Sequence, residues 1–162
     1  MPALTRVAVV TTAACLVVIA GLHLAWAFGF PWPAGDSTAL ARAVLGATDG
    51  GGLPPAPLTA AVAVALTGAA LLLLARIDAL GGSVRTLLTK DVPRRLVTLG
   101  CALLCAGLFL RGLGGFAKHA LGALDDRAHE YVVLDLRVYS PLCVLLALGA
   151  LLALRNQPTR AT

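Results

Sequence analysis

Four side chains in this sequence combine chemical reactivity with a place in or beside a long apolar segment: His23, Arg111, Asp135 and Tyr139. An imidazole can relay a proton, a carboxyl or phenol can donate one, and a guanidinium can hold an anion. A charged group within a membrane-spanning segment is costly and normally faces other protein groups, a wet cavity or a ligand. These four residues therefore form the core of the candidate site.

The elements that must position them are four apolar segments. Hydrophobic residues make up 59% of the 162 residues and charged residues only 13%, against about 25% charged in soluble domains. A helix needs about 20 residues to cross about 30 Å of hydrocarbon. The sequence therefore predicts a single all-α domain over residues 1–162, an integral membrane four-helix bundle with spans at about 7–29, 57–76, 94–116 and 136–155.

The distribution of charge predicts the orientation of these spans. Eight of the 13 basic residues lie on the side that carries both termini, while six of the eight acidic residues lie on the other. Positive charge is retained on the cytoplasmic side of membranes. We expect an N-in/C-in protein of the cell inner (plasma) membrane, with membrane lipids as partners. No basic cluster is interleaved with aromatic residues, so the net charge of +5 does not indicate a nucleic-acid partner.

Three of the candidate residues are expected at one depth. His23 lies 16 residues from the inner end of its span, and Arg111 and Tyr139 each lie 15 residues from theirs. At 1.5 Å per residue these counts are ~24 Å and ~22 Å. The three side chains should therefore lie in the outer half of the membrane.

Arg111 requires a counter-ion or an anionic ligand at that depth. Asp135 is the first candidate, because its segment leads directly into the fourth span; the other acids on that side are Asp36, Asp49, Asp125, Asp126 and Glu130. If the segment is helical, Asp135, Tyr139 and Cys143 share one face at i, i+4 and i+8. Snorkelling of Arg111 to the outer head groups is an alternative.

Two connecting segments carry local signals. Gly112-Leu-Gly114-Gly115 predicts that the third helix ends or bends beside Arg111, which places His119 in the following outer loop. In the first outer loop, Asp36 is a cap for a short helix Ser37–Leu45, and Gly46 is its stop. This helix would lie on the lipid interface or form a lid over an outward pocket.

Aromatic residues amount to only 5% of the chain, yet all eight, with all three histidines, fall on the outer half. Trp26 lies one turn beyond His23, and Phe109 lies beside Arg111, so both are candidate walls of a ligand site, with Arg137 nearby. The four cysteines lie in or at spans and are predicted to serve packing. No ligand spacing indicates a metal, and no motif indicates a cofactor.

Three segments together resemble a known family. They are Gly21-Leu-His-Leu-Ala-Trp-Ala27, Arg111-Gly-Leu-Gly-Gly-Phe116 and Asp135-Leu-Arg-Val-Tyr-Ser-Pro-Leu-Cys143. They are similar to those of the small four-span bacterial membrane proteins grouped as domain of unknown function 3995. The resemblance implies a four-helix integral membrane protein, and it implies no established activity.

Two functions from different classes are consistent with these residues. In the first, the outer end binds or converts an amphipathic or isoprenoid-like lipid ligand: Asp135 or Tyr139 donates a proton, His23 relays it, and Arg111 holds an anionic head. In the second, the protein is a non-enzymatic membrane subunit or scaffold with a membrane protein partner. The same Arg111, Asp135 and His23 then tie three helix ends together. A transporter is disfavoured, because the sequence has no two-half repeat and no broken helix pair.

Overall fold

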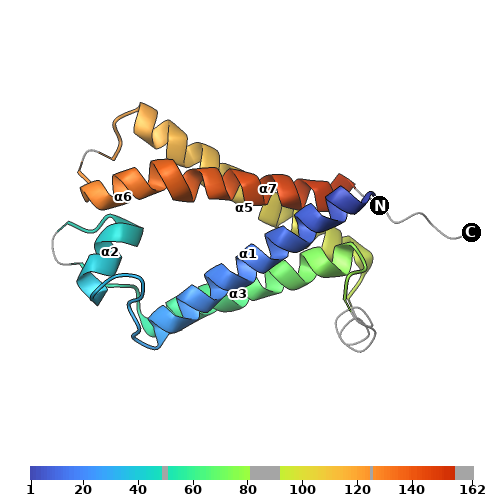
Figure 1. Cartoon of the computed structure of the whole chain (residues 1–162), viewed down its shortest axis with the longest axis horizontal. Coiled ribbons are helices and arrows are strands. Elements are labelled where there is room, and N and C mark those ends of the chain that lie inside the picture. Colours follow the sequence, from blue (N-terminus) through green and yellow to red (C-terminus); the bar gives the residue numbers. More distant parts are fainter. Residues whose placement is uncertain (49–50, 81–91, 125, 156–162) are drawn as a thin grey trace, which may run out of the picture.

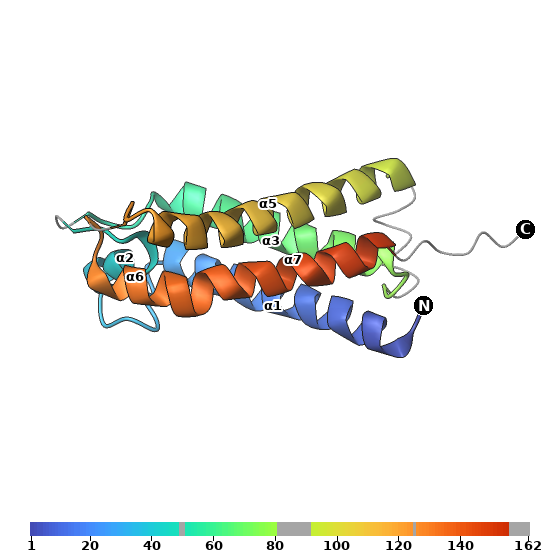
Figure 2. The same cartoon turned by 90° about the horizontal axis from the view of Figure 1, so that it is seen from above.

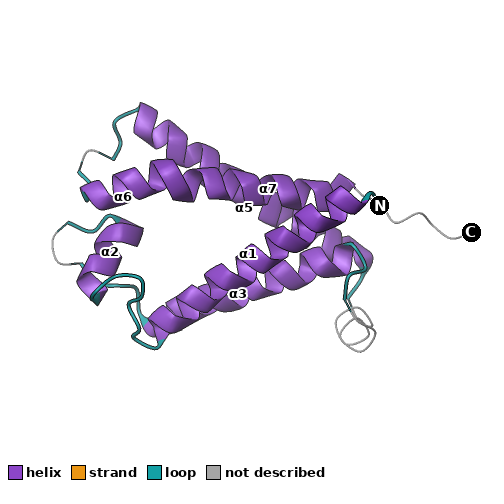
Figure 3. Cartoon of the chain, in the orientation of Figure 1, coloured by secondary structure: helices purple, strands orange, loops and turns teal. Residues whose placement is uncertain are grey.

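The computed structural model describes residues 1–48, 51–80, 92–124 and 126–155. Its described part is helical and contains no strand (Figure 3). The helices are α1 (Ala3–Ala27), α2 (Ser37–Leu45), α3 (Ala56–Arg76), α5 (Arg94–Ala120), α6 (His129–Leu134), the π-helical turn η1 (Asp135–Tyr139) and α7 (Ser140–Arg155). Asp49 and Asp125, two of the acids considered as partners of Arg111, lie outside the described residues.

Four helical segments in the described chain are long and apolar enough to cross a membrane. They are α1, α3, α5 and the uninterrupted run of α6, η1 and α7, over His129–Arg155. The prediction of an all-α, four-span membrane protein is confirmed, and the chain is a multi-pass membrane protein. The third and fourth spans are longer than expected, because α5 continues to Ala120 and the fourth helical run already begins at His129.

The four spans form two pairs. α1 packs along α3, and α5 packs along α7. Figure 1 shows the two pairs meeting near the start of α1 and the end of α7 and separating toward the opposite end, which we call the far end. The sequence predicts that the far end faces outward.

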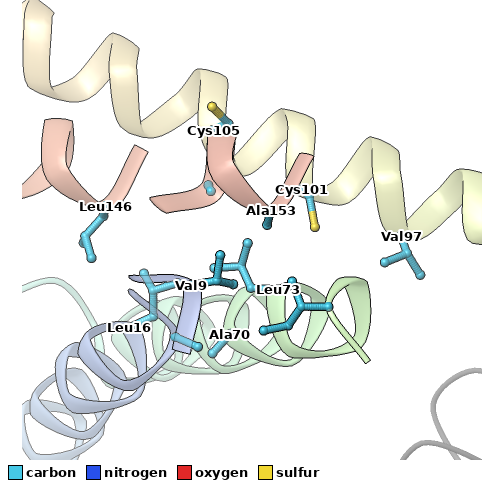
Figure 4. Close-up of a cluster of buried hydrophobic side chains, with 12 residues drawn as sticks. Val9, Leu16, Ala70, Leu73, Val97, Cys101, Cys105, Leu146 and Ala153 are labelled. Atoms are coloured by element: carbon cyan, nitrogen blue, oxygen red, sulfur yellow. The ribbon is translucent and has the colours of Figure 1, made fainter. Parts of the chain in front are cut away.

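The main cluster of buried apolar side chains lies in the half of the molecule that holds the start of α1 and the end of α7. All four spans contribute to it (Figure 4), through Val9, Ala13, Leu16, Ala70, Leu73, Ile77, Val97, Cys101, Cys105, Leu146, Ala150 and Ala153. Cys101 and Cys105 are buried in this core as free thiols, as the packing role predicted for them requires. Because this cluster ends near mid-span, the far end depends on separate contacts, which include the buried Leu40, Ala41, Leu124 and Ala128.

A glycine lies where α1 and α7 pack closely together. A Cβ atom at Gly149 would lie 1.9 Å from Oγ1 of Thr12. That hydroxyl is turned back onto its own helix and donates to the carbonyl of Ala8 at 2.9 Å. A hydrogen side chain at position 149 therefore permits the crossing that joins the two helix pairs.

The short helix α2 has the bounds and caps expected from the sequence. Oδ1 of Asp36 accepts a hydrogen bond from the backbone N–H of Ala39 at 2.8 Å. Gly46 ends the helix in the left-handed conformation, with φ of 70°, which glycine adopts without steric cost. α2 lies beside α6 in both views (Figures 1 and 2), at the far end where the helix pairs separate.

Candidate functional site

Arg111 and Asp135 form a direct ion pair between α5 and η1. Nη2 of Arg111 donates to Oδ1 of Asp135. The carboxylate is almost fully buried, with 1% of its side chain exposed, whereas the Arg111 side chain is 42% exposed. The first-choice partner predicted for Arg111 is therefore the residue that it contacts.

The π-helical turn η1 brings Ser140 to the same carboxylate. Ser140 Oγ donates to Oδ2 of Asp135 at 3.2 Å, and Arg111 Nη1 lies 3.5 Å from the same hydroxyl. Turns with π geometry place residues i and i+5 together and occur frequently at functional sites. They also suit this position, because Pro141 has no N–H and disfavours a regular α-turn before it.

The π turn also changes which residues were expected to lie on the same helix face as Asp135. Regular α spacing would have grouped Asp135 with Tyr139 and Cys143, but η1 covers Asp135–Tyr139. Asp135 instead pairs with Ser140, five residues on. The π turn therefore adds Ser140 to the groups around Asp135, a contact that regular α spacing did not predict.

Two glycines of α5 make room for this arrangement. A Cβ atom at Gly115 would lie 1.9 Å from Ser140 Oγ and 3.0 Å from Asp135 Oδ2. At Gly112 it would lie 2.9 Å from the carbonyl oxygen of Ser140 and 2.7 Å from a methyl group of Val144. This glycine-rich segment was predicted to end or bend the third helix; the helix does not end there, since α5 continues to Ala120, and Gly112 and Gly115 instead allow close packing of α5 against α7.

Because α5 continues to Ala120, His119 joins the site from the last helical turn rather than from a loop. It follows Arg111 and Gly115 at four-residue intervals, so the three share one face. Nε2 of His119 lies 3.4 Å from Oδ2 of Asp135, outside hydrogen-bond geometry, and the side chain is 14% exposed. We call Arg111, His119, Asp135 and Ser140 the polar cluster.

His23 and Trp26 lie apart from the polar cluster. Nδ1 of His23 donates to the carbonyl of Ile19 in its own helix at 2.9 Å, and its ring lies 4.8 Å from that of Trp26. Trp26 Nε1 donates to the carbonyl of Trp32 at 2.8 Å. Figure 1 shows why the two sets do not meet: the far ends of α1 and α7 diverge. In the described chain, it is His119 and Ser140 that lie against the Arg111–Asp135 pair.

The other three predicted site residues also lie outside the polar cluster: Tyr139, Arg137 and Phe109. The Tyr139 hydroxyl donates to the carbonyl of Ala43 in α2 at 3.2 Å. Arg137 is exposed on η1. Phe109 packs partly buried against the apolar core. Of the seven predicted site residues, Arg111 and Asp135 form an ion pair, and His23 and Trp26 form a separate ring contact.

Tyr139 belongs instead to a set of contacts that docks α2. The backbone N–H of Ala128 donates to the Gly46 carbonyl at 3.3 Å, and Arg127 Nη1 donates to the Leu45 carbonyl at the same distance. Arg42 and Glu130 form an exposed ion pair at 3.5 Å. These contacts satisfy carbonyl groups at the end of α2 and hold it against the fourth helical run.

Comparison with known proteins agrees with this architecture. Residues 16–150 match the family model described as a protein of unknown function, DUF3995. The chain belongs to the DUF3995 family. The match covers the whole polar cluster of this DUF3995 protein. No curated protein and no solved structure matches the chain.

Sequence reasoning about the DUF3995 protein missed His119 and Ser140. The four-residue spacing of Arg111, Gly115 and His119 was a usable signal, but only if the helix continued past its glycines. Ser140 gave no signal of its own, since its role depends on the π turn. Among the described residues, no group of three histidine, cysteine or acidic side chains is arranged to hold a metal ion.

Proposed function

We propose that this DUF3995 protein is a non-enzymatic membrane subunit or scaffold of the cell inner membrane, in which the polar cluster clasps the far end of the second helix pair. The observation that carries the proposal is the direct pairing of Arg111 with Asp135. Asp135 is buried, and two donors, from Arg111 and Ser140, contact its carboxylate.

The geometry favours a clasp over proton-transfer chemistry. Both oxygens of Asp135 accept hydrogen bonds, and the Tyr139 hydroxyl donates to the Ala43 carbonyl. The two proposed proton donors, Asp135 and Tyr139, are thus both engaged with groups of the protein rather than directed toward a ligand. His23, the proposed relay, donates to Ile19 within α1.

The clasp can be tested by replacing the ion pair with apolar side chains. Removing one partner of a buried pair is strongly destabilising, whereas replacing both with well-packed apolar groups is often neutral. Asp135→Leu alone should lower stability, and the double variant Arg111→Met/Asp135→Leu should recover most of the loss. The readouts are thermal unfolding of the purified protein in detergent and complementation of a strain that lacks it.

The stability and the complementation of these variants together test the scaffold proposal. A double variant that folds and complements supports the scaffold. A double variant that unfolds like the wild-type protein but fails to complement would overturn it, since the polar groups would then be needed for more than stability. A single variant of unchanged stability would also overturn it, because the pair would not be a clasp.

A second candidate function is the binding of an amphipathic or isoprenoid-like lipid ligand at the far end. The observation that favours it is the 42% exposure of the Arg111 side chain despite its pairing with a buried carboxylate. In this candidate Arg111 meets the anionic head of the ligand and Asp135 holds the guanidinium in place. In a binding assay of Arg111→Gln, the expected result is a loss of ligand binding that exceeds the loss of folded protein caused by leaving Asp135 unpaired.

A further inference from the structure

Three aromatic side chains are exposed on the loop that joins α1 to α2 at the far end (Figure 1). They belong to Phe28, Phe30 and Trp32, which are 74%, 67% and 67% exposed, and we call them the aromatic patch. Contact of large apolar side chains with water is unfavourable. The polar cluster and the contacts that dock α2 involve none of the three, so neither explains why they are exposed together.

The aromatic patch begins where α1 leaves the hydrocarbon. Between Arg6 and Asp36 the sequence holds no lysine, arginine, aspartate or glutamate. If the hydrocarbon begins after Arg6, the helix from Val7 to its end at Ala27 covers roughly 31 Å at 1.5 Å per residue. This length matches a hydrocarbon core of about 30 Å, and the head-group layer adds about 5–7 Å on each side. Residues 28–32 therefore fall within the head-group layer.

The loop satisfies nearly all of its own backbone donors, as a segment at the edge of the hydrocarbon must. The three residues that follow α1 donate their N–H groups to carbonyls in its last turns, at 2.9–3.2 Å. Ala34 donates to the carbonyl of Pro31 at 2.9 Å, and neither Pro31 nor Pro33 has an N–H to satisfy. Within residues 28–34, only the backbone N–H of Trp32 has no partner in the described chain.

A side-chain hydrogen bond holds the aromatic patch against the end of α1. Nε1 of Trp26 donates to the carbonyl oxygen of Trp32 at 2.8 Å, which closes the loop back onto the helix. The Trp32 indole is itself exposed, and no described residue accepts a hydrogen bond from its N–H. A buried indole N–H normally finds a partner inside the protein. This ring instead presents an apolar body and a free donor outward, the combination that suits a membrane interface.

We propose that the aromatic patch inserts into the head-group layer of the leaflet at the far end and anchors the pair of α1 and α3 there. Tryptophan is enriched at that depth, where its ring is apolar and its N–H can donate to lipid oxygens. An anchor is useful at this place, because the main cluster of buried apolar side chains ends near mid-span. The occupant is the phospholipid surface itself. Neither candidate function assigns a role to this loop, so the proposal goes beyond both.

The test measures the depth of Trp32 by fluorescence quenching in the full-length protein, reconstituted in phosphatidylcholine vesicles. The chain has two tryptophans, so the Trp32 signal is the wild-type emission minus that of Trp32→Phe. Phosphatidylcholine brominated near the carbonyl end of its acyl chains should quench Trp32 more strongly than the same lipid brominated near the methyl end. Iodide, present on both sides of the vesicles, should quench Trp32 less than about half as strongly as a free tryptophan derivative, because head groups shield the ring.

The key variant is Phe30→Asp, measured with and without Trp32→Phe. A charged side chain resists insertion beside the hydrocarbon, and the exposure of Phe30 predicts normal folding. Quenching of Trp32 by brominated lipid should fall to less than about half of its wild-type value, while iodide quenching rises. Leu121→Asp is the matched control. It places the same charge on a residue that is 81% exposed at the end of α5, and it should leave the Trp32 signal unchanged.

The wild-type measurement decides even where a variant fails to insert. Strong iodide quenching with weak bromine quenching would place the loop in water and overturn the anchor. Weak quenching by both reagents would mean that protein covers the ring, for example a second copy of the chain, and would also overturn it. Stronger quenching by bromine near the methyl end would place Trp32 within the hydrocarbon, against the proposal. An equal change in Phe30→Asp and Leu121→Asp would show that the patch is not the anchor.

Discussion

Ser140 fills the space that a side chain at Gly115 would occupy. A Cβ atom at position 115 would lie 1.9 Å from the Ser140 hydroxyl oxygen, and that hydroxyl donates to the buried carboxylate of Asp135. The absence of one side chain on α5 thus allows α7 to approach and lets the polar cluster form. The preceding residue, Gly114, differs: a Cβ atom there would meet no atom within 4 Å.

This relationship predicts opposite effects for two adjacent glycines. Gly115→Ala should destabilise the protein by about 1–3 kcal/mol, because it forces Ser140 and Asp135 apart in a packed site. Gly114→Ala should be neutral or stabilising by up to about 1 kcal/mol, since alanine is the better helix former. Equilibrium unfolding in mixed detergent micelles measures both. Equal stability of the two variants would contradict the described packing of α5 against α7.

Loss of the Ser140 hydroxyl should weaken the cluster less than loss of the Asp135 charge. Ser140→Ala removes one hydrogen bond to a carboxylate, at about 1.5–3 kcal/mol at most. Asp135→Asn removes the charge that balances Arg111, a larger loss for a buried group. Thermal unfolding should rank the wild-type protein first, Ser140→Ala second and Asp135→Asn last. The reverse order would mean that the ion pair does not hold the far end.

At the other crossing, Gly149→Ala should loosen the contact between the two helix pairs. The added methyl group would meet Thr12 Oγ1 at 1.9 Å and Thr12 Cβ at 2.9 Å. We expect destabilisation of about 1–3 kcal/mol from overpacking and partial recovery in Thr12→Ala/Gly149→Ala, where the hydroxyl and methyl groups of Thr12 are gone. No recovery in the double variant would place the damage somewhere other than this crossing.

Docking of α2 should depend on the Tyr139 hydroxyl. Tyr139→Phe removes its hydrogen bond to the Ala43 carbonyl, a loss of about 0.5–1.5 kcal/mol. Opening of α2 should then rise roughly two- to tenfold. The rate of thiol labelling at Leu40→Cys reports this opening, because Leu40 is 1% exposed. Tyr131→Phe is the control, and similar rates in the two variants would show that the bond does not hold α2.

The predicted orientation can be tested by labelling single cysteines in intact cells. In a background without the four native cysteines, Thr38→Cys at the far end should react with a membrane-impermeant thiol reagent. Ala3→Cys, at the end that carries the termini, should react only after the cells are opened. The opposite pattern would reverse the N-in/C-in prediction and place the polar cluster toward the cytoplasm.

The sequence by itself determined the membrane class, the number of spans and the short capped helix α2, and it made Asp135 the first candidate among the partners of Arg111. These depend on signals that a chain carries locally: long apolar runs, a capping aspartate, a terminal glycine, and a charge that needs an opposite charge nearby. The physical reason is that membrane insertion and helix capping are decided within one segment.

Only the tertiary structure decided which groups complete the site. His119 joined it because α5 continued through glycines that pack against α7, and Ser140 joined it because a π turn shifted the register of the fourth helical run. His23 was left out because the helix pairs diverge at the far end (Figure 1). Depth along a helix can be counted from the sequence, but lateral distance between helices depends on how closely their surfaces pack, and that is set by pairs of residues far apart in the chain.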